Sequence, residues 1–355
     1  MVKSNGSTVS LFEGRKFRAL ITGGAGFLGS HLAEALLKEG HEVLVLDDLS
    51  TGSAENLREL KGYEGLQYWI DSVGNKARLA ELVDDCDIIF HLAAAVGVRL
   101  IVESPVHTIE TNVTGTEFVL KAANKKKKPV FIASTSEVYG KSVQVPFREE
   151  DDLVLGTTTK GRWSYAASKL LDEFLALAYW KEKKLPVIVA RFFNIVGPRQ
   201  SARYGMVLPN FVSQALAGED VTVFGTGQQT RCFCYVGDAV QAILGLIRKP
   251  EAIGQIFNIG NNHEISIEDL AHQVIARSSS RSKVSYTPYE VAYEEGFEDM
   301  PRRVPSLEKI TGLTGWEPST ALGTCIDLVA QYLDHRTRKL EKQLVLRKSS
   351  QAAGL

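Results

Sequence analysis

Two residues four positions apart could together remove a proton from an alcohol. Tyr165 and Lys169 lie in Trp163-Ser-Tyr-Ala-Ala-Ser-Lys169, so in a helix their side chains share one face. A tyrosine with a pKa near 10 is a poor base at neutral pH, and a nearby ammonium favours its phenolate. Thr135 supplies a hydroxyl about thirty residues upstream, in Ser134-Thr-Ser-Glu-Val-Tyr-Gly140. We predict that Tyr165 is the base, that Lys169 tunes it, and that Thr135 binds the same substrate hydroxyl.

A glycine-rich turn near the amino end predicts a dinucleotide site. Glycines recur every third residue in Thr22-Gly-Gly-Ala-Gly-Phe-Leu-Gly29, between an expected strand at Phe17–Ile21 and an expected helix at His31–Lys38. Glycine permits the tight turn and the close approach of a pyrophosphate, which the amino end of the helix then faces. A glycine turn without a ligand is the alternative. The turn residues expected to contact the cofactor are Gly23, Gly26, Phe27, Leu28 and Gly29.

Acidic residues follow two of the expected strands and bear on the choice of cofactor. Asp47 ends the strand Glu42–Leu46, about twenty residues after the glycines, where an acid binds the ribose hydroxyls of the adenosine. A carboxylate there repels a 2′-phosphate, so we expect NAD rather than NADP. Asp71 ends the strand Leu66–Ile70 and could accept a bond from the adenine amino group, or could simply terminate the strand. Ser72 and Ala93 complete the expected cofactor contacts.

The elements that must position these residues alternate between strands and helices. Such alternation predicts an α/β fold with a Rossmann-type, doubly wound parallel sheet. After Asn194 short elements broken by glycine and proline indicate a smaller C-terminal substrate-binding lobe, although Ile256–Ile259 could return to the main sheet. Further strands are expected at Ile88–His91, Val130–Ser134 and Val187–Phe192, and helices at Thr108–Ala123, Tyr165–Lys183, Val236–Arg248, Ser266–Ala276 and Thr320–Leu333.

These elements divide the chain into four expected parts. Residues 1–14 are expected to be a loose tail and residues 15–196 a dinucleotide-binding domain. Residues 197–335 are expected to form the lobe, partly interleaved with the main sheet. Residues 336–355 are expected to be a basic tail in which a solvated helix end is followed by disorder.

Taken together, the chain resembles the extended short-chain dehydrogenase/reductase superfamily, in its nucleotide-sugar branch of epimerases, dehydratases and decarboxylases. The resemblance spans roughly residues 15–333 and includes four more segments: His91-Leu-Ala-Ala-Ala95, Asn112-Val-Thr-Gly-Thr116, Arg191-Phe-Phe-Asn-Ile-Val-Gly-Pro198 and Gln229-Thr-Arg-Cys-Phe233. It implies that tightly held NAD oxidises the sugar C4 hydroxyl to a ketone. It also implies that Asn194 and Arg231 contact the diphosphate, and that a homodimer forms through helices 108–123 and 164–183.

The residues that follow Thr135 distinguish the reactions of this branch. The 4,6-dehydratases carry Asp-Glu there, whereas this chain has Ser136-Glu137 and lacks the acid that expels water. Simple 4-epimerases carry small or neutral residues at both positions. The Thr-Ser-Glu sequence resembles the UDP-glucuronate decarboxylases, which form UDP-xylose or a 4-keto-pentose. A UDP-sugar 4-epimerase is the nearest alternative, and a non-catalytic NAD-binding regulatory protein is an alternative of another class.

Two arginines support a carboxylate-bearing substrate. Arg162 precedes Tyr165 by three residues, and Arg303 lies in Phe297-Glu-Asp-Met-Pro-Arg-Arg-Val-Pro305. Both positions resemble arginines of the decarboxylases. The alternatives are a surface cation for Arg162 and a diphosphate contact for Arg303. Glu137 is expected to orient the sugar or to manage a proton at C5, unless it is a structural acid paired with one of the arginines.

Bulk composition narrows the class of partner. The formal net charge of −1 gives no reason to expect nucleic acid or an anionic membrane. Residues 1–14 lack an apolar signal core, and no run of about 18 apolar residues exists to span a membrane. Four cysteines lack metal-ligand spacing, and Cys232 and Cys234 alternate as they would on one strand. We therefore expect a cytoplasmic protein without a bound metal, while Asp47 indicates NAD and the resemblance implies a UDP-linked sugar.

Overall fold

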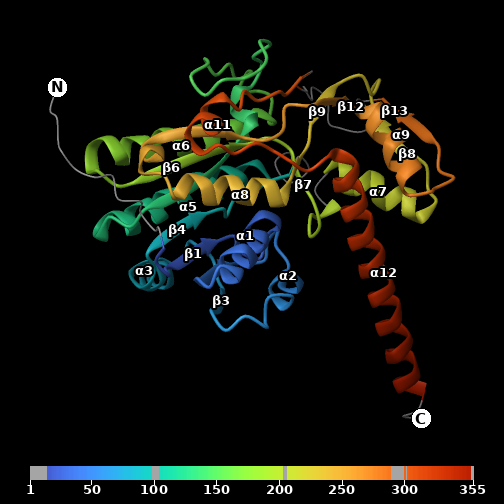
Figure 1. The fold of residues 1–355 in the computed structure, drawn as a ribbon, viewed down its shortest axis with the longest axis horizontal. Coiled ribbons are helices and arrows are strands. Elements are labelled where there is room, and N and C mark those ends of the chain that lie inside the picture. Colours follow the sequence, from blue (N-terminus) through green and yellow to red (C-terminus); the bar gives the residue numbers. More distant parts are fainter. Residues whose placement is uncertain (1–13, 98–103, 203–205, 289–299, 301, 353–355) are drawn as a thin grey trace.

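Seven parallel strands form the central sheet in the order β11-β6-β5-β4-β1-β2-β3, as the computed structural model of the chain shows (Figure 1). The structure describes residues 14–97, 104–202, 206–288, 300 and 302–352. The expected Rossmann-type sheet is confirmed, and so is the return of the chain to it near residue 256. The strands of the sheet are β1 (Arg18–Thr22), β2 (Glu42–Asp47), β3 (Leu66–Ile70), β4 (Ile88–His91), β5 (Val130–Thr135), β6 (Val187–Phe192) and β11 (Gln255–Ile259).

Helices cover both faces of this sheet because the buried strands present apolar side chains on both sides. One face packs against α1 (Phe27–Lys38), α8 (Val236–Ile247) and α11 (Glu308–Thr314). The other packs against α3 (Lys76–Asp85), α5 (Pro105–Lys126) and α6 (Trp163–Lys183). Since α8 and α11 come late in the chain yet complete the first face, the lobe and the main domain interleave, as the sequence predicted. Two shorter elements stand at the rim of the sheet, α2 (Ala54–Arg58) and the 3-10 helix η1 (Ser136–Tyr139).

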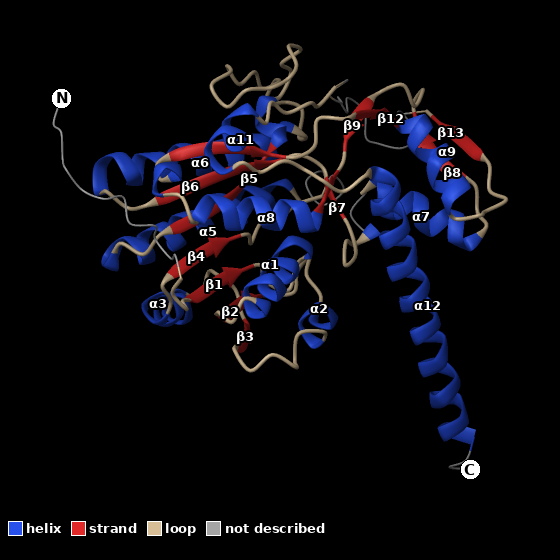
Figure 2. Ribbon diagram, in the orientation of Figure 1, coloured by secondary structure: helices blue, strands red, loops and turns tan. Residues whose placement is uncertain are grey.

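The smaller lobe lies beside the carboxyl ends of the strands and has its own apolar core (Figure 2). Its described residues form short strand pairs and the helices α7, α9 and α12, of which sequence reading found α9 and the start of α12 but not α7. The elements are β7 (Ile195–Val196), α7 (Val207–Ala217), β8 (Val221–Phe224), β9 (Thr230–Cys232), β10 (Cys234–Tyr235), β12 (Glu264–Ser266), α9 (Ile267–Arg277), β13 (Val284–Thr287) and α12 (Leu322–Ala352). The 3-10 helix η3 (Pro250–Ala252) lies between α8 and β11 and packs into the core of the main sheet.

Two expectations about the lobe need correction. Cys232 ends β9 and Cys234 begins β10, so the two cysteines belong to different strand pairs rather than to one strand. The last helix does not stop near residue 333: α12 continues to Ala352 and extends away from the body (Figure 1). No glycine or proline interrupts residues 324–352, and an ion pair between Asp334 and Arg338 supports the exposed part. The expected amino-terminal tail, residues 1–13 of it, lies outside the described residues.

Candidate active site

The glycine turn between β1 and α1 has the shape that a dinucleotide needs. Gly23 adopts φ +76°, and a Cβ there would lie 2.7 Å from the backbone nitrogen of Ala93. A Cβ on Gly29 would lie 2.8 Å from the Cα of Gly24 and would overlap the carbonyl oxygen of Gly23. Gly26 caps α1 without any side chain, so the amino end of the helix stays open to an anion. The residues present therefore fit NAD, whose pyrophosphate this turn would hold.

The two acids expected near the adenosine lie together at one edge of the sheet. β2 and β3 pair in parallel with Asp47 opposite Ile70, which places Asp71 next to Asp47. Asp47 is buried and accepts bonds from the backbone nitrogens of Ala25, at 2.9 Å, and Leu49, at 2.8 Å. Burial raises the pKa of Asp47, and these bonds oppose the rise. Asp47 thus also fixes the glycine turn, a structural contribution that its spacing alone did not reveal.

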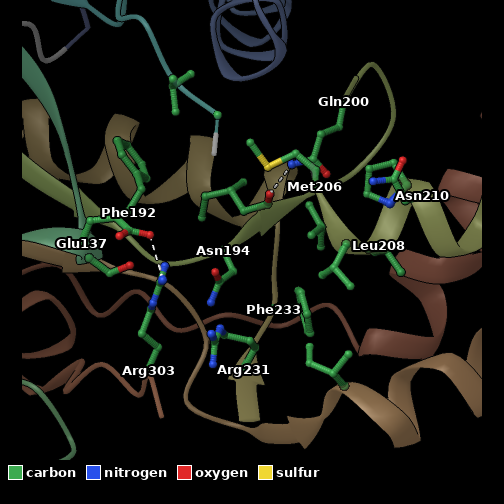
Figure 3. A pocket seen from close by; sticks show the side chains of 18 of the residues that line it. Glu137, Phe192, Asn194, Gln200, Met206, Leu208, Asn210, Arg231, Phe233 and Arg303 are labelled. Atoms are coloured by element: carbon green, nitrogen blue, oxygen red, sulfur yellow. Dashed lines mark hydrogen bonds and ion pairs between the residues drawn. The ribbon is translucent and has the colours of Figure 1, made fainter. Parts of the chain in front are cut away.

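A cavity of about 450 Å³ lies between the sheet and the lobe. Phe27, from the glycine turn, lines its edge. Figure 3 shows side chains of the main domain on one part of the wall and side chains of the lobe, such as Leu208 and Phe233, on another. Every residue predicted to be catalytic or to bind substrate lines it except Lys169: Thr135, Ser136, Glu137, Arg162, Tyr165, Asn194, Arg231 and Arg303.

Glu137 lies between the two predicted arginines. One carboxylate oxygen is 3.2 Å from Nη2 of Arg162, and the other is 2.7 Å from Nη2 of Arg303 (Figure 3). The side chains of Arg162 and Arg303 are only 7% and 10% exposed. Arg162 is therefore not the surface cation that sequence reasoning kept as an alternative. Glu137 pairs with both arginines, whereas the sequence alternative had it paired with one.

Backbone pairing holds Arg303 in this position across a long sequence separation. Phe147 donates its backbone N–H to the carbonyl of Val304 at 2.7 Å, and Ser306 donates to the carbonyl of Phe147 at 2.7 Å. The buried amide of Asn258 donates to Phe147 at 3.0 Å and accepts from the hydroxyl of Tyr139 at 2.8 Å. Because Tyr139 belongs to η1, these bonds connect the turn that bears Glu137 with the segment that bears Arg303.

Tyr165 is buried at the cavity wall and hydrogen-bonds to the Thr135 hydroxyl. Burial raises the pKa of Tyr165, and the negative charge of Glu137 raises it further. The bond from Thr135 and the charge of Arg303 oppose this rise. Within the protein chain alone these influences together favour the protonated phenol. The role expected of Lys169, tuning Tyr165 as a base, stays a prediction.

Lys169 is buried and bonds to a second buried charge. Its Nζ lies 2.7 Å from Oδ2 of Asp172, and the two side chains are 3% and 0% exposed. Sequence reasoning missed Asp172, although its signal was available: three residues after Lys169, it shares the same helix face. It also missed Glu173, which accepts bonds from Ser134 and Arg191 and so fixes α6 against β5 and β6.

The residues expected at the diphosphate meet where β6 leads into the lobe. Asn194 adopts φ +39° and donates its amide to the carbonyl of Cys232 at 3.1 Å. Arg231 is buried on β9 and donates to the carbonyl of Thr230 at 2.7 Å. Figure 3 shows both side chains directed into the cavity next to Arg303. Amide and guanidinium groups on one wall can bind a diphosphate by charge-assisted hydrogen bonds.

Among the described residues, no group of three or more histidine, cysteine or acidic side chains could hold a metal ion. No helix among the described residues has the length and apolar character needed to cross a membrane. All four cysteines are buried and free of disulfides.

Comparison with known proteins identifies the family of this chain and several relatives. A sequence model of the NAD-dependent epimerase/dehydratase family matches residues 19–260. The UDP-N-acetyl-alpha-D-glucosaminuronate decarboxylase of Bacillus cytotoxicus is 44% identical, with 86% of this chain and 94% of that protein covered. UDP-glucuronic acid decarboxylase 1 of Danio rerio is 36% identical, with 94% of this chain and 76% of that protein covered.

Solved structures share the fold. The UDP-glucuronic acid 4-epimerase of Bacillus cereus, in complex with UDP-glucuronic acid and NAD, superposes with a TM-score of 0.81. It is 26% identical, and the alignment covers 90% of this chain and 99% of that one. Two relatives named as decarboxylases and a structure named as an epimerase thus match almost the whole chain.

Proposed function

This chain belongs to the NAD-dependent epimerase/dehydratase family, and on that premise we propose that it is a UDP-glucuronate-type decarboxylase. The proposed substrate is a UDP-linked glucuronate with either a hydroxyl or an acetamido group at C2. One observation carries the proposal: Glu137 lies between Arg162 and Arg303, in the same cavity as Tyr165 and Thr135.

The charge of this cluster favours a uronate over a neutral sugar. Two guanidinium groups and one carboxylate lie together on the buried wall. A carboxylate that enters a site shielded from water needs a cationic partner, and these guanidinium groups can supply it. A neutral hexose has no carboxylate with which to use them. The contact between Glu137 and both arginines also demonstrates that their side chains can reach one carboxylate.

The proton chemistry of the first step falls to Tyr165 and Thr135. In the proposed reaction the phenolate form of Tyr165 takes the proton of the C4 hydroxyl, while Thr135 holds the same oxygen. When bound, NAD supplies the acceptor for the hydride that leaves C4. Lys169 is proposed to bind the nicotinamide ribose and to tune Tyr165. Asn194 and Arg231 are proposed to grip the diphosphate, which fixes the sugar ring against the base.

Decarboxylation then needs little further machinery. With a ketone at C4, the carboxylate on C5 belongs to a β-keto acid. Carbon dioxide leaves as the bond between C5 and C6 breaks, and the electron pair moves toward the ketone oxygen, forming an enolate. Tyr165, now a neutral phenol, can donate to that oxygen, and a proton returned to C5 completes the step. Glu137 is proposed to orient the sugar or to manage that proton.

Four substrates distinguish the proposal from its nearest alternative. The purified enzyme with NAD is incubated with UDP-glucuronate, UDP-N-acetylglucosaminuronate, UDP-glucose or UDP-galactose. We expect carbon dioxide from at least one uronate, with a product lighter by that mass, and none from the hexoses. A product of unchanged mass, formed from UDP-glucuronate or by interconversion of the two hexoses, would replace the proposal with a 4-epimerase.

We also propose a homodimer formed through α5 and α6. On α5, Val106 and Ile109 are 67% and 42% exposed, and on α6, Leu171 and Phe174 are 50% and 64% exposed. Each pair is three residues apart, so it forms a stripe on one helix face. Because α5 and α6 pack side by side, the two stripes can make one apolar surface of the kind that dimers bury. A cytoplasmic location stays a prediction, to which the free thiols of the four buried cysteines lend support.

A further inference from the structure

A buried carboxylate contacts Lys169, and the proposed reaction has no role for it. We propose that Asp172 is a positioning residue that holds Lys169 in place and balances its charge, and so limits how strongly Lys169 can stabilise the phenolate of Tyr165. The carboxylate lies 2.7 Å from Nζ and is completely buried. This inference rests on the proposed function to the extent that Tyr165 is the base.

Polar side chains lead from this pair across the main domain. The hydroxyl of Thr116, on α5, interacts with the carboxyl of Asp172 and opposes the rise that burial gives its pKa. Nε2 of His91, on β4, lies 3.1 Å from that hydroxyl oxygen, and Nδ1 lies 2.8 Å from the hydroxyl of Thr22. Thr22 directly precedes the glycine turn. This series of side chains therefore extends from the cofactor turn to the pair of Lys169 and Asp172.

The charges of this region follow from burial and from Lys169. His91 is neutral, because burial lowers its pKa to about 3. Burial raises the pKa of Asp172, and the ammonium of Lys169 is the largest influence that opposes this rise. The contact between Lys169 and Asp172 therefore favours the charged carboxylate.

Such a carboxylate changes what Lys169 can do. An ammonium alone would attract a phenolate in this low-dielectric region, but an ammonium paired with a carboxylate is neutral as a unit. The negative charge of Asp172 also contributes, after burial and Glu137, to the raised pKa of Tyr165. Asp172 therefore offsets the lowering of the Tyr165 pKa that is expected from the ammonium of Lys169.

Other charged groups near Tyr165 and this pair take part in contacts of their own. Glu173, the neighbour of Asp172 on α6, pairs with Arg191 of β6 at 2.8 Å. Glu137 of η1 pairs with Arg162 and Arg303, and the charge of Arg303 opposes the rise in the pKa of Tyr165. His91 on β4 is neutral, and Thr116 on α5 carries no charge. Replacing Asp172 therefore alters one charge and leaves these contacts in place.

The test titrates Tyr165 itself, so it needs neither substrate nor turnover. The ultraviolet absorbance of tyrosinate is followed against pH in the full chain loaded with NAD. Subtracting the curve of Tyr165→Phe isolates Tyr165, and the same subtraction is made in an Asp172→Asn background. We expect the Tyr165 midpoint to fall by about half a pH unit or more in Asp172→Asn. An unchanged or higher midpoint overturns the proposal.

Two further variants separate charge from packing. Asp172→Ser removes the same charge with a smaller side chain and should lower the midpoint as well, even if Asp172→Asn folds poorly. Thr116→Val removes the hydroxyl but keeps the carboxylate, and should not lower it. Equal shifts in Thr116→Val and Asp172→Asn would mean that packing, not charge, is responsible, and the proposal would fail.

Activity provides the link to the reaction. If Tyr165 is the base, the acidic limb of the pH profile of kcat/KM should move to lower pH in Asp172→Asn, by the shift measured in the titration. A titration shift without any carbon dioxide release would leave the role of Asp172 standing while contradicting the decarboxylase. Carbon dioxide release together with an unchanged Tyr165 midpoint would leave the decarboxylase standing and would contradict the role of Asp172.

Discussion

At the scale of single residues, the interaction of Glu137 with Arg162 and Arg303 sets the chemistry of the cavity wall. Because these charges are buried, water cannot screen them, and each contributes more electrostatic free energy than it would at the surface. A substrate carboxylate that enters this wall must compete with Glu137 for the guanidinium groups or join them. The cluster is therefore where selectivity for a uronate is expected to arise.

Replacing Arg303 tests this selectivity. We expect Arg303→Ala to slow consumption of UDP-glucuronate by tens-fold to thousands-fold, since an unpaired buried charge costs about 2–5 kcal/mol. The adjacent Arg302 is 54% exposed and pairs with Glu264, so Arg302→Ala is a matched control that should keep nearly full activity. Steady-state rates of carbon dioxide release measure both. Equal losses in the two variants would contradict the assignment of Arg303.

Replacing Tyr165 tests the proposed base. Tyr165→Phe keeps the ring and removes only the hydroxyl that bonds to Thr135. We expect turnover to be abolished while NAD still binds with nearly the parent affinity, because the phenol contributes proton transfer rather than contact area. Calorimetric titration of NAD and a product assay give the two readouts. Activity within about tenfold of the parent would rule out Tyr165 as the essential base.

At the scale of elements, the turn from β1 to α1 depends on close approach of backbone to backbone. We expect Gly29→Ala to abolish NAD binding and to lower the melting temperature, because the added Cβ would overlap the Gly23 carbonyl. Gly62→Ala is the matched control: it is exposed, and a Cβ there meets nothing within 4 Å. Thermal unfolding and NAD titration of both variants measure the difference. Normal NAD affinity in Gly29→Ala would refute the proposed cradle.

The surface formed by α5 and α6 gives a second prediction at this scale. Phe174→Asp places a charge in the middle of the proposed interface and should convert the dimer to a monomer. Val143→Asp is the control, because Val143 is 84% exposed and lies outside both helices. Analytical ultracentrifugation gives the mass of each. A dimer that survives Phe174→Asp would place the interface elsewhere.

At the scale of the whole molecule, buried His91 couples stability to pH. Its pKa falls from the ordinary 6.5 to about 3 in the fold, so below pH 6.5 the unfolded chain binds a proton that the folded chain refuses. The contribution of His91 is complete above pH 6.5 and is lost as pH falls toward 3. The free energy of unfolding should decline by up to about 1.4 kcal/mol per pH unit from this residue.

Urea unfolding at several pH values measures this decline. Variant His91→Gln cannot take up the proton, so its free energy of unfolding should fall less steeply with pH than that of the parent. It should also be less stable at neutral pH, because glutamine cannot reproduce both hydrogen bonds to Thr22 and Thr116. An identical slope in parent and variant would show that His91 does not contribute.

Local hydrophobic periodicity explains which expectations about the fold were confirmed. The alternating pattern predicted the strands and most helices of the main domain, because fully buried parallel strands are near-continuous apolar runs. It missed the short strand pairs of the lobe, because strands of two to four residues carry too little periodicity, and it also missed α7. The predicted length of the last helix was too short, because the basic end of α12 resembles a tail in composition although no glycine or proline interrupts it.

The sequence by itself determined the chemical groups: a glycine turn, Asp47, Tyr165 with Lys169, and the family to which these belong. These signals are local, since each depends on spacing within one turn or one helix. Only the tertiary structure decided that Glu137 contacts both Arg162 and Arg303, and that the imidazole of His91 bridges Thr22 and Thr116. Those contacts connect residues far apart along the chain, and burial, which depends on the whole fold, sets their charges and the pKa of Tyr165.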